Sequence, residues 1–255
     1  MKKVTKLVYA ALFSALALVL GLIQIPTPFA PYLALDGSEI VVLVAGNFFG
    51  FGIMSTVIIL RSVLRFVFGL STGFAIVGEV AAIVSSFIFG GMFLLIKKYT
   101  KNKITTFKTN NILCIVLSLL LIPFIYFAIK VNNNPWLILG IVTLIVPLLS
   151  YLIFAIFRKN NCIKSSTKIL EASSAIVINS LIMTTLNFFF ITPSNMLQKP
   201  ATFMNVIKEI GMPLDTFILT TILPLIPFNI LKGLISVIVY FILEKTISVV
   251  IKKCQ

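Results

Sequence analysis

Long apolar runs follow one another along this chain, and short polar or basic segments separate them. The runs cover about residues 7–25, 38–49, 51–70, 75–96, 112–129, 136–157, 169–191 and 215–251. Most are long enough to span a bilayer, because about 20 apolar residues in a helix cross its hydrocarbon core. The run at 38–49 is short, and the run at 215–251 is too long for one straight span. The pattern predicts an all-α integral membrane protein with about eight spans.

Prolines interrupt the pattern after the first run. Three of them fall within residues 26–31, which excludes a regular helix there, because each proline lacks a backbone donor and restrains its predecessor. We therefore expect residues 26–36 to form a loop that lies outside the membrane or folds back into the protein. Asp36 and Glu39 follow, three residues apart, and predict a capping box that opens the next helix.

Prolines also shape the C-terminal part of the chain. Pro193 is expected to end the helix over about 169–191, and a polar segment follows as far as about Pro213. Pro224 and Pro227 lie inside the last apolar run. Proline removes a helical hydrogen bond and crowds the preceding turn, so we predict a kink in a final helix over about 215–251.

The composition supports a membrane protein. Hydrophobic residues make up 59% of the 255 positions, the mean hydropathy is +1.13 and only 11% of the residues are charged, which is outside the range of soluble domains. A net charge of +14 would suit a nucleic-acid-binding protein. The cations, however, fall in clusters between apolar runs, so we expect no nucleic-acid partner.

The positions of the cations predict the orientation in the membrane. Fifteen of the 21 lysines and arginines fall within residues 2–6, 97–108, 158–168 and 245–253. The segments assigned to the opposite side hold three, Lys130, Lys199 and Lys208. Because cytoplasmic loops carry an excess of lysine and arginine, we predict a multi-pass protein of the cell membrane with both termini in the cytoplasm.

Several classes of chemistry are disfavoured by the residues present. The chain has no histidine, and Cys114, Cys162 and Cys254 show no metal-ligand spacing, so no metal site or disulfide framework is indicated. Seven scattered acids do not suggest a lipid-processing enzyme. No Walker-A sequence occurs, so any ATP must be used by a partner. We expect a protein that is not an enzyme and holds no cofactor.

Asn229 and Lys232 are the most informative polar residues, because they lie within an apolar run. A lysine at bilayer depth costs roughly 2.5–3.5 kcal/mol and therefore usually faces a protein interior or a binding site. Spaced three apart, the two share a helix face. A carboxamide matches the imide edge of a flavin or pyrimidine, and lysine offers a point charge to a carbonyl or phosphate. Alternatively, Lys232 extends to the interface and Asn229 caps carbonyls freed by the prolines.

Two further polar residues are candidates. Asn187 lies among aromatic residues that could cover a planar ring, although an interfacial aromatic belt with a bridging asparagine explains the same pattern. Glu79 follows a helix that carries Arg61 and Arg65 four residues apart. An ion pair of Glu79 with Arg65 would lower the burial cost of both, so we favour structural pairing over ligand contact for Glu79.

Ala11 and Ala15 form a small-x-x-x-small face on the first predicted helix. Small residues at this spacing let another helix approach closely. The face would serve either internal packing or a partner subunit.

These residues together resemble a known family, the riboflavin-binding S components of energy-coupling factor (ECF) transporters. The similarity covers about residues 1–97 and 168–251, and includes the Ala-x-x-x-Ala helix, the proline-rich loop that ends at Asp36 and residues 183–193. Its most specific part is Pro-Phe-Asn-x-x-Lys-Gly at 227–233.

The resemblance implies a six-helix substrate binder that joins a transmembrane coupling subunit and two ATPase subunits. It further implies that Leu35, Asn187, Asn229 and Lys232 contact riboflavin. Ala11 and Ala15 match the face that meets the coupling subunit. Gly78 and Glu79 stand where relatives vary, so the resemblance implies the family and leaves the substrate open to a related vitamin or a flavin with phosphate.

The chain departs from the six-helix pattern between its two halves. Residues 1–97 are predicted to hold core helices 1–4, residues 98–167 to hold basic loops around an extra transmembrane hairpin, and residues 168–255 to hold the last two core helices. The expected function is riboflavin capture for ATP-driven uptake. The alternatives are an S component for another vitamin or for a flavin with phosphate, and a non-transport anchoring or assembly protein.

Overall fold

The computed structural model describes residues 3–27, 30–70, 75–100, 163–218 and 224–253. The predicted extra hairpin, its flanking loops and the count of eight spans fall largely outside these residues. Within the described residues the protein is mostly helical, and four helical stretches are long and apolar enough to cross a membrane. These are Val4–Leu22, Ile76–Lys98, Glu171–Leu197 and Leu225–Val249. The prediction of an all-α membrane protein is confirmed.

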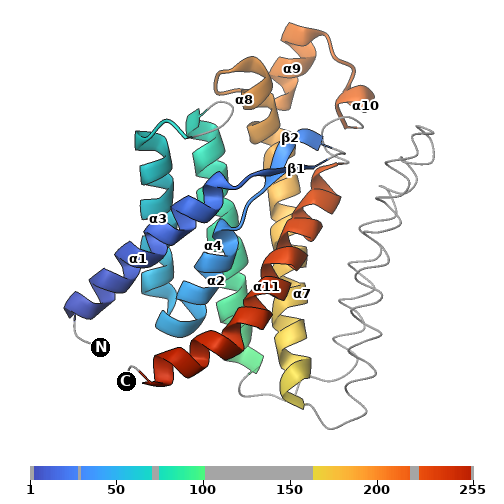
Figure 1. Cartoon of the computed structure of the whole chain (residues 1–255). Helices are drawn as coiled ribbons and strands as arrows, with labels where there is room; N and C mark the ends of the chain where they lie inside the picture. Colours follow the sequence, from blue (N-terminus) through green and yellow to red (C-terminus); the bar gives the residue numbers. More distant parts are fainter. Residues whose placement is uncertain (1–2, 28–29, 71–74, 101–162, 219–223, 254–255) are drawn as a thin grey trace.

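The helices form one bundle with a small sheet near its middle (Figure 1). The N-terminal elements are α1 (Lys3–Leu22), β1 (Ile25–Thr27), β2 (Ala30–Leu35), α2 (Ser38–Phe49), α3 (Phe51–Val67) and α4 (Ala75–Thr100). The C-terminal elements are α7 (Ile163–Leu186), a π-helix (Asn187–Ile191), α8 (Thr192–Leu197), α9 (Phe203–Ile210), α10 (Leu214–Phe217) and α11 (Leu225–Lys253). Helix α7 packs beside α4, α1 packs on α2 and α3, and α11 crosses α7 and α2.

The short helix α2 lies in the centre of the bundle. It contributes Leu43 to a core shared with α4, α7 and α11, and Val42 to a second core shared with α1 and α3. A helix that is apolar all round is buried on every side, which explains why this run is hydrophobic although too short to be a span. Gly50, at φ +90°, makes the sharp turn from α2 into α3.

The loop expected at 26–36 contains a two-stranded antiparallel sheet. Ile25 pairs with Leu35 and Pro26 with Ala34, and a register shift follows Pro26. No helix occurs at the described positions 26–27 and 30–36, as the prolines predict. The predicted capping box is wrong: the N-cap residue of α2 is Gly37, and the Glu39 side chain accepts a hydrogen bond from Ser86 instead of returning to the backbone. The buried guanidinium of Arg61 lies 3.8 Å from Glu39 Oε1, and this ion pair replaces the expected contact of Glu39 with the helix end.

Two boundaries in the C-terminal part also differ from expectation. Pro193 does not end the helix, because the chain widens into a π-helix at Asn187–Ile191 and continues as α8 to Leu197. Pro193 falls in the first turn of α8, where a missing N–H is tolerated. The polar segment that follows holds the unexpected helix α9, which the side chains of Thr202 and Asn205 cap reciprocally.

The expected kinked helix over 215–251 runs through residues 219–223, which lie outside the described residues, so its continuity stays a prediction. On either side of them the structure describes α10, Leu214–Phe217, and α11, which begins at Leu225 directly after Pro224. Pro227 lies in the first turn of α11, where no helical hydrogen bond is lost.

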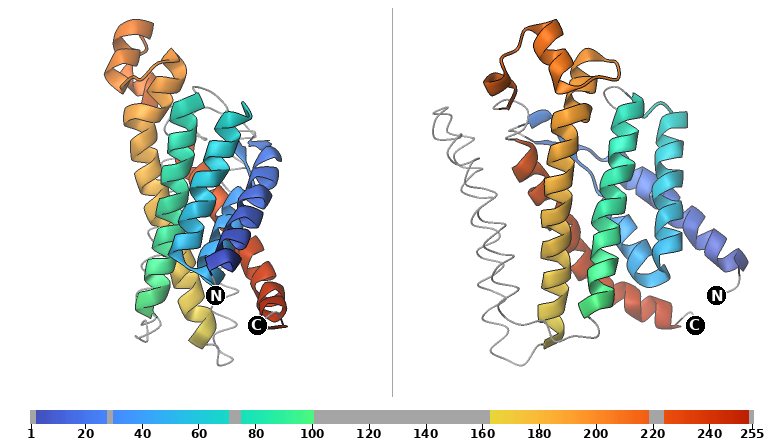
Figure 2. Two further views of the ribbon diagram at one scale, coloured as in Figure 1. Left: turned by 90° about the vertical axis from the view of Figure 1, so that its left-hand side faces the viewer. Right: turned by 180° about the vertical axis from the view of Figure 1, so that it is seen from behind.

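The basic ends of the helices gather at one end of the bundle. Helix α1 begins, α4 ends, α7 begins and α11 ends at this end, whereas α8, α9 and α10 lie at the opposite end (Figures 1 and 2). Lys97 and Lys98 lie in the last turn of α4, while Lys199 and Lys208 lie in the opposite region. This placement agrees with the charge asymmetry of the sequence, and the cytoplasmic side remains a prediction.

Candidate functional site

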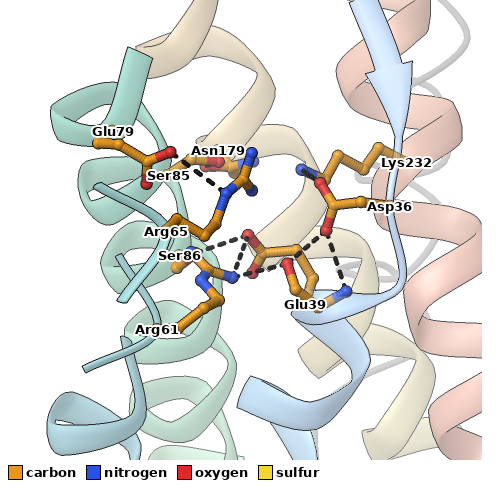
Figure 3. A network of polar contacts seen from close by, with 10 residues as sticks. Asp36, Glu39, Arg61, Arg65, Glu79, Ser85, Ser86, Asn179 and Lys232 are labelled. Carbon is orange, nitrogen blue, oxygen red and sulfur yellow. Dashed lines mark hydrogen bonds and ion pairs between the residues drawn. The ribbon is translucent and has the colours of Figure 1, made fainter. Parts of the chain in front are cut away.

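The site begins where the sheet meets the last helix. The Lys232 ammonium on α11 lies 3.1 Å from Asp36 Oδ2, just after β2, and donates a hydrogen bond to it (Figure 3). The other Asp36 oxygen accepts hydrogen bonds from the Ser38 backbone N–H, at 3.0 Å, and from the Ser38 hydroxyl. Burial disfavours the Asp36 carboxylate, but Lys232 and Ser38 outweigh it and hold the pKa of Asp36 below its ordinary value. Asp36 is therefore a fixed anion.

A second set of contacts extends from Ser38 into the bundle. Arg61 on α3 donates to the Ser38 hydroxyl at 2.7 Å and to the Ser86 hydroxyl on α4 at 2.9 Å. Ser86 in turn donates to Glu39 Oε1 at 2.6 Å, and that oxygen lies 3.8 Å from Arg61. The Arg61 side chain is only 1% exposed. The sequence pattern indicates no partner for this arginine.

The Arg65 and Glu79 side chains form the ion pair that the sequence predicts. Arg65 Nε lies 3.2 Å from Glu79 Oε1, and both side chains are 9% exposed. The two groups are not aligned as a hydrogen bond, so the contact is a purely ionic one. Glu79 thus faces Arg65, on the far side of the network from Lys232 (Figure 3).

Asn229 lies one helical turn before Lys232 on the same face of α11. The residue is 8% exposed, and its Nδ2 is a buried donor that has no hydrogen-bond partner among the described residues. Leaving such a donor unpaired costs about 1–3 kcal/mol. In the described part of the chain, therefore, this amide does not cap a carbonyl, and a free donor beside Lys232 is what a bound polar ligand would require.

Asn187 has a different environment. It occupies the first position of the π-helix, and its Nδ2 donates to the Met183 carbonyl at 2.7 Å. The neighbouring Phe188 ring stacks on Phe203 at 5.0 Å and contacts Phe217 at 5.8 Å. These rings pack on one another and join α9 and α10 to the end of α7. The structure places Asn187 beside this aromatic cluster and not in the Asp36–Lys232 network.

The remaining candidates lie where the sequence suggests. Leu35 is the last residue of β2 and directly precedes Asp36. Ala11 and Ala15 are both exposed on α1, whereas Ser14 and Ala17 are buried. The small-residue face therefore points away from the described bundle and is available to lipid or a partner.

Sequence reasoning missed the network around Lys232. Asp36 and Glu39 were assigned to a helix cap, and Ser38 and Ser86 were not singled out. The available signal was the concentration of charged and hydroxyl residues at 36–39, immediately after a proline-rich segment and before an apolar helix.

Comparison with known proteins places this chain among transporter subunits. A family model described as "ECF transporter, substrate-specific component" matches residues 5–118 and 112–244. A solved structure described as "Structure and mechanism of the S component of a bacterial ECF transporter" is 20% identical to this chain, with a TM-score of 0.53. The alignment covers 98% of this chain and 99% of that one, and at this identity the likeness concerns the fold. Proteins of curated function give no match.

Proposed function

This chain belongs to the family of ECF transporter substrate-specific components, and from that premise we propose that its substrate is riboflavin or a close flavin. Members of this family are membrane subunits that bind a substrate and work with the transporter's coupling and ATPase subunits. The finer assignment concerns the identity of the substrate and the residues that hold it.

The observation that carries the proposal is the unpaired amide donor of Asn229 next to the Lys232 ammonium. A flavin ring presents carbonyl acceptors and an imide N–H along one edge. A carboxamide offers a donor and an acceptor that match such an edge, and the ammonium has donors beyond the one given to Asp36. Asn229 and Lys232 would therefore bind the polar edge of the ring, with Leu35 contributing an apolar contact beside them.

The other predicted contacts have weaker support. Asn187 would donate a hydrogen bond to a second polar edge of the ligand only if it broke its present hydrogen bond to the Met183 carbonyl. Glu79 is occupied by Arg65 and serves mainly to hold that arginine. The hairpin of β1 and β2 acts as a cover over the site. Asp36, which directly follows β2, joins this hairpin to α11 through its contact with Lys232.

Transport itself would depend on partner subunits. The sequence has no Walker-A motif, so the ATPase subunits supply the energy. The exposed Ala11–Ala15 face of α1 permits close helix approach and is the proposed contact with the coupling subunit.

Binding of riboflavin to the purified protein in detergent tests the proposal. We expect saturable quenching of flavin fluorescence and a yellow protein when it is isolated from riboflavin-replete cells. A parallel panel of uncharged and charged vitamins serves as the control. Saturable binding of a different vitamin, without flavin binding, would reassign the substrate within the family. Binding of no vitamin would favour an anchoring role.

A further inference from the structure

The end of α7 carries three polar side chains on one face. Ser180, Thr184 and Asn187 follow one another at spacings of four and three residues, which places them in line along the helix. The Ser180 hydroxyl donates to the Ile226 carbonyl at 3.5 Å, so this face is the one that meets α11. The Asn187 amide is bonded within its own helix. Of the three, Thr184 has a buried Oγ1 that finds no hydrogen-bond partner among the described residues.

The unpaired hydroxyl of Thr184 is unusual for a helical threonine. Serine and threonine hydroxyls inside helices commonly donate to the carbonyl one turn earlier. The neighbouring Thr185 makes this bond to the Leu181 carbonyl at 2.9 Å, and Ser14 and Thr56 make it at 2.7 and 3.0 Å in α1 and α3. Thr184 does not make it, so its hydroxyl keeps both a donor and acceptor sites for another partner.

The facing side of α11 carries a second unpaired group. Helices α7 and α11 pack against each other, and they approach so closely that a Cβ added at Gly233 would lie 2.9 Å from Ile176 Cγ1. Asn229 lies between Gly233 and Ile226, the two α11 residues that contact α7, and its Nδ2 is unpaired among the described residues. The two unpaired groups therefore belong to one seam between the helices.

We propose that Thr184 is a further ligand-binding residue, whose hydroxyl forms a hydrogen bond with the same bound molecule as Asn229 and Lys232. The inference rests on the proposed function and extends the site from α11 to α7. It requires a ligand with polar groups at more than one position, as a flavin has on its ring and on its hydroxyl-bearing side chain. The residue is distinct from Asn187, which the resemblance implies and whose amide is already bonded.

The helix distortion beside Thr184 supports a binding role. Thr184 lies in the last turn of α7, and the π-helix begins at Asn187. Single π-helical turns at the end of or within α-helices are rare and occur frequently at functional sites. An unpaired buried hydroxyl also destabilises the free protein, since its desolvation is not compensated, and a bound polar group would remove that cost.

The test replaces Thr184 by Val, which keeps the branched shape of the side chain and removes the hydroxyl. Titration of the full-length protein in detergent by flavin fluorescence quenching should show that Thr184→Val raises the Kd for riboflavin by about tenfold. Without ligand its Tm should not fall, because no hydrogen bond within the described protein is lost. Thr185→Val is the matched control: it removes the adjacent hydroxyl, which is bonded to its own helix, and should change the Kd by less than about twofold.

The outcomes separate this inference from the proposed function. If the unmodified protein binds no riboflavin, the proposed function fails and the inference fails with it. If that protein binds riboflavin but Thr184→Val binds it equally well, or loses no more affinity than Thr185→Val, the inference alone is overturned. A lower Tm of Thr184→Val with an unchanged Kd would likewise show a purely structural hydroxyl. Should Thr184→Val not fold, Thr184→Ser, which retains the hydroxyl, must bind riboflavin more tightly than Thr184→Ala, and equal affinities would overturn the inference.

Discussion

The Arg61–Glu39 and Lys232–Asp36 ion pairs are built from similar groups but sit in different surroundings. The first lies between neighbouring helices, its side chains are 1% and 4% exposed, and two serine hydroxyls accept hydrogen bonds from the Nη1 and Nη2 groups of the arginine. The second joins residues 196 positions apart, and its side chains are 21% and 12% exposed. A fully enclosed pair of this kind can only support the fold, whereas a partly open pair can also meet a ligand.

Serine is the link between the two pairs. The Ser38 hydroxyl donates a hydrogen bond to Asp36 and accepts one from Arg61 on α3. Because Arg61 also donates to Ser86, the end of β2 is connected to both α3 and α4. The contrast therefore lies within one continuous network. It predicts that changes at Arg61 are felt in stability, and that changes on α11 are felt in binding.

The largest effect is expected for Arg61→Met. Removing the guanidinium leaves Glu39 buried without its cation, which typically costs about 3–5 kcal/mol of unfolding free energy. Thermal unfolding in detergent should show a large drop in Tm. The double variant Arg61→Met with Glu39→Met removes both charges and should recover much of the loss. If Arg61→Met alone leaves Tm unchanged, the enclosed pair is not structural.

Replacing both Ala11 and Ala15 by Trp should separate transport from binding and folding. The two alanines are exposed on α1, so bulky side chains there would not disturb the described core. They would, however, keep a partner helix at a distance, and uptake of radiolabelled riboflavin by cells that hold the partner subunits should be abolished. Riboflavin affinity of the purified variant should stay within about twofold. Exposed Leu12→Trp on the same helix is a comparison variant for general insertion effects. Full uptake by the double variant would exclude this face as the contact.

Asn229→Ala should act on binding and leave the fold nearly intact. Its Nδ2 has no hydrogen-bond partner among the described residues, so truncation removes no donor contact seen in the free protein. With riboflavin bound, the loss of a buried hydrogen bond should weaken the affinity by about 1–3 kcal/mol. Fluorescence titration gives the change in Kd, and thermal unfolding without ligand gives the control. A large loss of Tm with unchanged Kd would reverse the assignment.

Features set by residues close together in the sequence could be predicted, whereas those set by residues far apart could not. The bounds of α2 and the starts of α3 and α4 were predicted closely, because the apolar runs that define them are local signals. The Arg65–Glu79 pair was also predicted, since both residues flank one connection. The Asp36–Lys232 pair was not, because nothing local relates positions so far apart and Asp36 also fitted a helix cap.

The errors around Pro193 and in residues 203–210 have a different cause. A proline normally stops a helix, but the π-helix before it changes the register so that Pro193 falls in a tolerant first turn. Helix α9 is short and amphipathic, and it is fixed by packing of Phe203 against Phe188 that periodicity alone does not reveal. Both features depend on contacts between segments.

The smallest effect is expected for Asn187→Ala, which sharpens the contrast between the two amides. In the free protein the Asn187 Nδ2 already donates to the Met183 carbonyl at 2.7 Å, whereas that of Asn229 is unpaired. A ligand would have to replace an existing hydrogen bond at Asn187, so the net gain there is small. We expect the variant to weaken riboflavin binding by about 0.5–1 kcal/mol, clearly less than Asn229→Ala. Titrating both variants under the same conditions measures the difference. A loss at Asn187 equal to or larger than that at Asn229 would show that the ligand recruits the π-helix amide directly, and that the free protein's hydrogen bond is given up on binding.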